Sequence, residues 1–127
     1  MKCYFDYNGT VPSGVKAVRE GLTTRVFFDY STETRKDMDG EDVTVLTAEN
    51  VDVESSDYGD IVNAIVRDRY AADKVEAIMA NYQEAMDSTS SLTEDKRAEY
   101  KAEYEAFQAW RAKAKEVATA TVGQISA

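Results

Sequence analysis

The hydrophobic pattern changes along the chain from a period of two to a period of 3.6. Apolar and polar residues alternate before Ser55, as in half-buried strands, and recur three and four positions apart after it, as in amphipathic helices. Because each half is too small to bury a core alone, we predict one domain. The prediction is an α+β fold in which a small antiparallel sheet of three or four strands packs with two or three helices. Its parts are residues 1–54, mainly strand, 55–118, mainly helix, and 119–127, a frayed tail.

The first strand is predicted at Lys2–Tyr7, where Cys3, Phe5 and Tyr7 alternate with Tyr4. The alternation predicts that Phe5 faces the core and that Tyr4 faces outward. Val11–Gly21 fits two interpretations, a short helix capped by Ser13 or an edge strand over Val15–Arg19. We favour irregular or strand structure there.

A β-hairpin is predicted in the next segment. Thr23–Thr32 is rich in β-branched and aromatic residues, and Val43–Thr47 resumes the alternation after the Asp39-Gly40 turn signal. We therefore expect Thr24–Tyr30 to pair antiparallel with Val43–Thr47. On the first of these strands Val26, Phe28 and Tyr30 should face inward, and Phe27 outward. Ala48–Glu54 continues the strand pattern as far as the helix caps.

Three helices are expected after the strands. Ser55, Ser56 or Asp57 caps the first, and Asp73 caps the second. The third begins between Ser91 and Glu94, with Ser91 or Thr93 as its cap. The buried positions predicted for the first two helices are Ile61, Val62, Ile65, Val66, Val75, Ile78, Met79 and Tyr82, with Met86 at the limit of the second.

The longest periodic run, Glu94–Val117, organises the rest of the chain. Its apolar stripe consists of Tyr100, Tyr104, Phe107, Trp110, Ala114 and Val117. A stripe this aromatic must be covered, so we expect core rather than interface, with Trp110 buried against Ile61, Ile65 or Ile78. Outward aromatics of the strands, such as Tyr4 and Phe27, are candidates for a binding surface.

Composition narrows the classes of partner. The formal charge is −9, and residues 31–60 hold ten acidic side chains against two basic ones. This charge argues against nucleic acids and anionic membranes, and no apolar run is long enough to span a bilayer. The single cysteine, Cys3, has no partner for an internal disulfide, and its place in an alternating strand predicts a small buried hydrophobic side chain rather than a reactive thiol. We expect a cytoplasmic protein of the cell in which it is made, binding another protein.

Catalytic chemistry finds little support in the sequence. There is no histidine, the commonest general base and transition-metal ligand, and no glycine-rich phosphate-binding motif. Asp37–Asp42 clusters carboxylates as a calcium loop does, but its glycine is fourth rather than sixth and its twelfth position is Ala48. We predict no catalytic, cofactor-binding or metal-binding residues and no enzymatic activity. We expect a solvated hairpin tip at which five carboxylates are exposed without a cation: Glu33, Asp37, Asp39, Glu41 and Asp42.

Two stretches resemble small uncharacterised proteins of phages and prophages of gut Bacteroides-type bacteria. They are residues 58–70 (YGDIVNAIVRDRY), followed by 75–79 (VEAIM), and residues 105–115 (EAFQAWRAKAK). The helix carrying Trp110-Arg111 is also similar to the closing helix of tail-fibre assembly proteins. The resemblance covers about half of the chain, and the proline-containing segment that often precedes that helix in the family is absent, since Pro12 is the only proline.

The resemblance implies a non-catalytic phage or prophage protein that binds protein, as a minor tail or virion component or as a tail assembly factor. Incorporation into the virion would be compatible with that role. The alternative is an acidic inhibitor of a host protein, such as an anti-defence protein whose segment 31–60 mimics a polyanion.

Overall fold

The computed structural model describes residues 1–126, with four strands followed by three helices. The strands form one antiparallel sheet in the order β1-β4-β3-β2. The predicted α+β class, with strands first and helices after them, is therefore confirmed. The elements are β1 (Lys2–Asp6), β2 (Lys16–Glu20), β3 (Thr23–Lys36), β4 (Asp42–Val53), α1 (Tyr58–Arg69), α2 (Ala72–Met86) and α3 (Glu94–Ile125).

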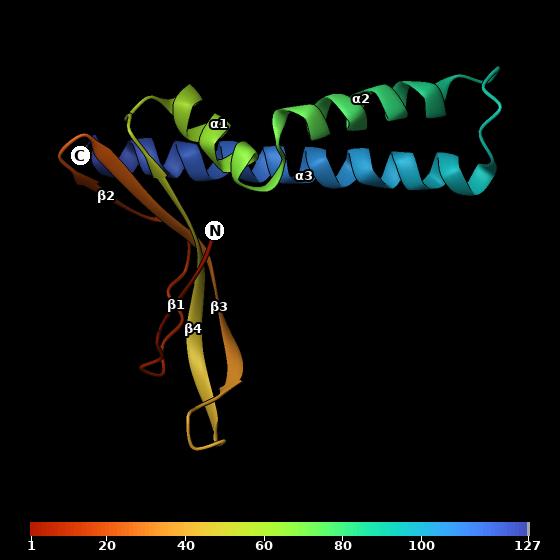
Figure 1. Ribbon diagram of the computed structural model, residues 1–127. Coiled ribbons are helices and arrows are strands. Elements are labelled where there is room, and N and C mark those ends of the chain that lie inside the picture. The colour runs from red at the N-terminus through yellow and green to blue at the C-terminus, as the bar shows by residue number, and fades with distance from the viewer. Residues whose placement is uncertain (127) are drawn as a thin grey trace.

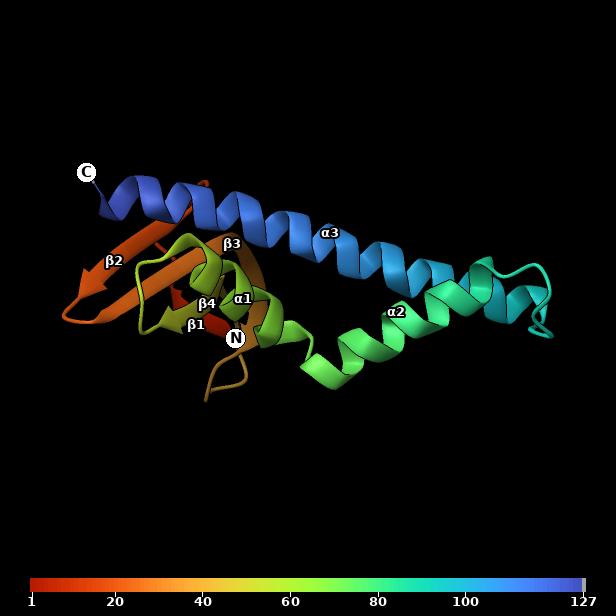
Figure 2. The same ribbon diagram turned by 90° about the horizontal axis from the view of Figure 1, so that it is seen from above.

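Helix α3 is the axis of the molecule (Figure 1). The sheet and α1 pack on its C-terminal half, whereas α2 runs along its N-terminal half, beyond the sheet, in both views (Figures 1 and 2). The β3–β4 hairpin points away from the helices, so its tip lies far from them (Figure 1). Only part of the sheet is therefore covered by helices.

The β3–β4 hairpin confirms the predicted antiparallel hairpin and its Asp39-Gly40 turn, but the predicted pairing of Thr24–Tyr30 with Val43–Thr47 is wrong. Gly40 adopts a φ of 79° in the loop between the strands, a conformation that glycine tolerates. The register, however, differs from the expected one: Val43–Thr47 pairs with Ser31–Arg35, and Thr24–Phe28 pairs with Glu49–Val53. The difference arises because β4 is one continuous strand of 12 residues rather than two short segments.

A β-bulge at Asp29 changes which side chains face the helices. The β3–β4 register shifts between Phe28 and Ser31, and Asp29 adopts a φ of 51°. Its carboxylate lies 2.7 Å from the Lys113 ammonium on α3. Before the bulge Val26 and Phe28 are buried toward the helices, but Tyr30 lies near Phe27 on the other face. The predicted inward position of Tyr30 is therefore wrong, because the extra residue reverses the alternation.

The tail predicted at 119–127 is also wrong as far as Ile125, because α3 continues to that residue; Ala127 lies outside the described residues. The Gln124 amide makes two hydrogen bonds near β2: its Oε1 accepts from the Ala17 N–H at 2.8 Å, and its Nε2 donates to the Val15 carbonyl at 2.6 Å. Together with the burial of Thr121, these bonds hold the last turns of α3 against the sheet. They also cap part of the free edge of β2. The strand alternative predicted for Val15–Arg19 is confirmed, because β2 spans Lys16–Glu20.

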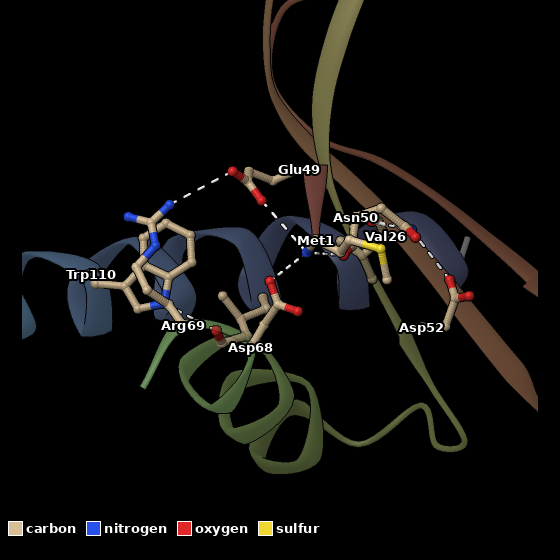
Figure 3. A network of polar contacts seen from close by, with 9 residues as sticks. Met1, Val26, Glu49, Asn50, Asp52, Asp68, Arg69 and Trp110 are labelled. Atoms are coloured by element: carbon tan, nitrogen blue, oxygen red, sulfur yellow. Dashed lines mark hydrogen bonds and ion pairs between the residues drawn. The ribbon is translucent and has the colours of Figure 1, made fainter. Parts of the chain in front are cut away.

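The core lies between the covered part of the sheet, α1 and α3. Trp110 is 6% exposed, and its indole N–H donates to the Ile65 carbonyl at 3.0 Å, as predicted for burial of the stripe. The Arg69 guanidinium lies 3.5 Å from the centre of the indole ring and 3.7 Å from Glu49 (Figure 3). The Met1 amino group joins the same cluster through Glu49. Strand β4 and helices α1 and α3 are thereby linked.

Helix α2 departs most from its predicted burial. Ile78 is buried, but Met79 and Met86 are exposed because α2 packs mainly against one neighbour, α3. The expected Asp73 cap is wrong, since the helix begins at Ala72 without a side-chain cap. Asp57 caps α1 and Thr93 caps α3, and both were among the cap residues predicted for these helices.

Candidate protein-binding surface

The face of the sheet turned away from the helices carries an apolar depression, called here the outer-face hollow. Its volume is about 370 Å³. Such a volume is at the lower end of the range of small-ligand pockets and is large enough for an apolar side chain. The hollow is lined by Phe5, Pro12, Lys16, Val18, Phe27, Tyr30 and Leu46.

Strand pairing brings these residues together from distant parts of the chain. Phe5 of β1 is paired with Leu46 of β4, and Lys16 of β2 is paired with Phe27 of β3. The Phe5 and Phe27 rings meet edge to face, with centroids 5.9 Å apart and an interplanar angle of 68°. This geometry is favourable for an aromatic pair and holds the two rings in place. The bulge at Asp29 turns the Tyr30 side chain to the same face, where it also lines the hollow.

The connection between β1 and β2 borders the hollow. These strands lie at opposite edges of the sheet, so residues 7–15 must pass across it. Pro12 from this connection lines the hollow. Phe5 and Val18 remain 39% and 38% exposed, whereas Leu46, the cross-strand partner of Phe5, is 8% exposed. The hollow therefore has a buried floor and accessible apolar walls.

Two polar groups line the hollow and would favour one orientation of a bound side chain. The Lys16 side chain supplies an ammonium, and Tyr30 supplies a hydroxyl. A tyrosine phenol is neutral at physiological pH and can donate a hydrogen bond, and burial raises the pKa of Tyr30 further above its ordinary value. The arrangement suits an apolar side chain flanked by a hydrogen-bond acceptor or a carboxylate.

The aromatic residues predicted as a possible surface divide into several environments. Phe27 and Tyr30 belong to the hollow, whereas Tyr4 lies on the opposite face, where Arg35 stacks 4.6 Å from its ring centre. Trp110 belongs to the core, and Tyr104 stacks on Tyr82 with centroids 3.8 Å apart. The stripe on α3 is thus largely core, as expected.

Phe5 was predicted to face the core and instead lines the hollow, so that prediction is wrong. The reason is that β1 pairs with the part of β4 that extends beyond the helices. Its alternation is real, but helices cover neither of its faces there. Cys3, expected to be buried, is only half-buried for the same reason. The exposed fractions of Phe5 and Val18 depend on the topology, which the alternation alone does not specify.

The acidic hairpin tip is more ordered than five free carboxylates would be. The Asp37 carboxylate accepts hydrogen bonds from the Asp39 and Glu41 N–H groups, both at 2.9 Å. Asp42 pairs with Lys36 at 2.5 Å. Glu33, which is only partly exposed, pairs with Lys2 at 3.4 Å. The expected exposure is therefore confirmed for Asp37, Asp39, Glu41 and Asp42 and is wrong for Glu33. Among residues 1–126, the three of these carboxylates without a salt bridge are Asp37, Asp39 and Glu41.

Within residues 1–126, no group of three or more acidic or cysteine side chains is close enough to hold a metal ion. None of the helices described is long and apolar enough to cross a membrane. Comparison of the chain with protein-family models, curated proteins and solved structures found no match.

Proposed function

We propose that the protein acts by binding another protein, and that the outer-face hollow receives an apolar side chain of that partner. The observation that supports this most directly is the accessible Phe5 ring, packed against Phe27 over a buried floor and beyond the reach of the helices. Rigid aromatic rings that lose little entropy are typical anchors of protein interfaces. The contact between the Phe5 and Phe27 rings already restricts both side chains, which lowers the conformational entropy lost on binding further.

The biological role that we propose is that of a phage or prophage protein, as a minor tail or virion component or as a tail assembly factor. The support is the resemblance carried by residues 58–70, 75–79 and 105–115. In this role the protein is not an enzyme, and its partner is a phage structural protein.

An acidic inhibitor of a host protein is the second candidate. It is favoured by exposed carboxylates, among them Asp39 and Glu41, at the end of a hairpin that projects from the molecule (Figure 1). A basic surface on a host protein would meet these charges first. Such a complex would weaken as salt is raised, because exposed charges are screened.

Phe5 and its neighbour Tyr4 provide a matched test of the hollow. The two side chains are 39% and 47% exposed and lie on opposite faces of β1. We expect Phe5→Ser to abolish capture of the partner from infected cells, and Tyr4→Ser to preserve it. Equal capture by both variants, with both folded by circular dichroism, would show that the hollow is not the binding surface.

The identity of the captured proteins separates the two roles. Mass spectrometry of purified particles should detect the protein if it is a virion component. Co-purification with tail proteins from infected cells, without presence in particles, would indicate an assembly factor. A salt-sensitive complex with a host nuclease or DNA-binding protein, lost in Asp39→Asn/Glu41→Gln, would indicate the inhibitor.

A further inference from the structure

A second concave surface lies between α1 and α3 and is called here the basic groove. Its volume is about 440 Å³. Val62, Val66 and Phe107 form an apolar floor, and Arg67, Arg111 and Lys115 supply positive charge. The groove is lined by Tyr58, Gly59, Val62, Asn63, Val66, Arg67, Val75, Phe107, Arg111 and Lys115. None of these residues is acidic.

The three cations of the basic groove stand out in a protein with a formal charge of −9. Among residues 1–126, none of the three has a carboxylate within salt-bridge distance, although acidic side chains outnumber basic ones. Arg69 and Lys113, on the same two helices, are both paired. The groove therefore combines unneutralised positive charge with apolar surface, which favours an acidic segment that also carries an apolar side chain.

The tip of the β3–β4 hairpin has this chemistry. Met38 is fully exposed at the tip, between Asp37 and Asp39, and Glu41 follows two residues later. Methionine is flexible and polarizable, so it adapts readily to an irregular apolar floor. The Asp37 hydrogen bonds to the Asp39 and Glu41 N–H groups fix the loop, which reduces the entropy lost on docking.

The two surfaces of one molecule do not meet. The basic groove lies between the helices, and the hairpin tip points away from them (Figure 1). Contact between tip and groove therefore requires two molecules. Because the tip of one copy meets a different surface of the next, a single contact leaves a free tip and a free groove at the ends of each pair, to which further copies can add head to tail.

We propose that the basic groove binds the hairpin tip of a second copy of this chain, with Met38 on the apolar floor and Asp39 and Glu41 beside the groove cations. The copies associate head to tail, into rings or short chains. One loop in one groove buries less surface than stable complexes do, so the association is weak and becomes visible at high protein concentration. This proposal does not depend on the outer-face hollow or on its partner.

Sedimentation velocity from about 10 μM to about 1 mM protein, the range in which a weak contact forms, tests the proposal. We expect the mean mass of the wild-type protein to rise with concentration, without stopping at a dimer. Two variants should each remain monomeric. One carries Arg111→Glu and Lys115→Glu in the groove, and the other carries Met38→Ala, Asp39→Lys and Glu41→Lys at the tip.

Mixing the two variants is the decisive measurement. The groove variant keeps an intact tip, and the tip variant keeps an intact groove, so an equimolar mixture should form a dimer and nothing larger. The control is Lys101→Glu, an exposed charge reversal on α3 outside the groove, which should associate as the wild type does. Circular dichroism verifies that each variant is folded.

Three results would overturn the proposal: a wild-type protein that stays monomeric up to about 1 mM, variants that associate as the wild type does, or a mixture that remains monomeric. A wild type that stops at a symmetric dimer insensitive to both sets of substitutions would point to another interface and would also overturn it. Failure here leaves the outer-face hollow untouched, because Phe5→Ser alters neither the tip nor the groove.

Discussion

The indole N–H of Trp110 on α3 donates a hydrogen bond to the main-chain carbonyl of Ile65 on α1, at 3.0 Å and across 45 residues of sequence. The ring itself is buried, with Phe28 of β3 5.9 Å away between centroids and the Arg69 guanidinium over its face. One side chain thus joins both helices to the sheet, through apolar contact and through a polar bond.

Replacement of Trp110 should separate these two contributions. Trp110→Ala removes the buried ring and should lower the free energy of unfolding by about 3 to 5 kcal/mol. Trp110→Phe retains much of the apolar contact but removes the hydrogen bond, so its cost should be smaller, about 1 to 2 kcal/mol. Urea denaturation measures both. Tyr7→Ala, at an aromatic residue that is 38% exposed, is the control and should cost less than either. A cost for Trp110→Ala below about 1 kcal/mol would show that the stripe is not core.

Gln124 should hold the end of α3 to β2. Gln124→Ala removes the acceptor for the Ala17 N–H and the donor to the Val15 carbonyl. We expect faster hydrogen exchange at Ala17 and in the last turns of α3, with a loss of about 1 to 2 kcal/mol in global stability. Gln83→Ala, at an exposed position of α2, is the matched control. Unchanged exchange at Ala17 would mean that Gln124 does not secure this edge.

The Asp29 bulge combines a left-handed backbone with an ion pair, and substitutions separate the two. Asn tolerates a positive φ, so Asp29→Asn should lose only the interaction with Lys113, about 0.2 to 1 kcal/mol for a partly exposed pair. Asp29→Ala also places an unfavourable residue in that conformation and should cost roughly 1 kcal/mol more. Thermal or urea unfolding measures the difference. Equal effects of the two substitutions would contradict a role for the backbone conformation.

The same pair predicts a dependence of stability on alkaline pH. The hydrogen bond with Asp29 raises the pKa of Lys113 above its ordinary value of 10.5, and attraction by Asp29 and Glu116 adds to the shift. A raised pKa in the folded state means that the stabilising contribution is complete below 10.5 and is lost as pH rises through the folded value. Unfolding should be measured between pH 9 and 12, a range of about 1.5 pH units on either side of the ordinary pKa of 10.5. Over this range the free energy of unfolding should fall more steeply with pH for the wild type than for Asp29→Asn. Parallel curves for the two proteins would rule this linkage out.

The elements were largely predictable from the sequence because their signals are local. The Thr93 cap, the Asp39-Gly40 turn and the buried face of α1 all follow from neighbouring residues. The end of α3 could not be predicted from neighbouring residues, because Gln124 is bound to residues at β2, more than 100 positions away in the sequence.

The candidate surfaces depended even more on distant contacts. The hollow was only partly predictable: Phe27 was identified as outward, but the side of Tyr30 depends on a bulge that no local residue signals. Arg67, Arg111 and Lys115 were not recognised as a groove, because the crossing of α1 and α3 brings them together. What the sequence could not specify was therefore the placement of elements relative to one another.

The hairpin tip should respond differently to loss of different carboxylates. Asp39 and Glu41 are exposed, and removing their charges relieves repulsion at the tip. Asp37→Ala instead removes the acceptor of two main-chain hydrogen bonds and should cost about 1 kcal/mol.

The test is thermal unfolding at several salt concentrations, together with a calcium titration. Asp39→Asn/Glu41→Gln should raise the melting temperature of the wild type slightly at low salt, and the gain should shrink in physiological salt, where the screening length is about 8 Å. Asp37→Ala should lower the melting temperature at every salt concentration, because a hydrogen-bonded turn is less sensitive to screening than exposed charges are. Calcium should stabilise the protein no more than magnesium does, since the loop spacing differs from that of a calcium-binding loop. A large increase in melting temperature with micromolar calcium, absent with magnesium and lost in Asp39→Asn/Glu41→Gln, would show instead that the tip is a metal site.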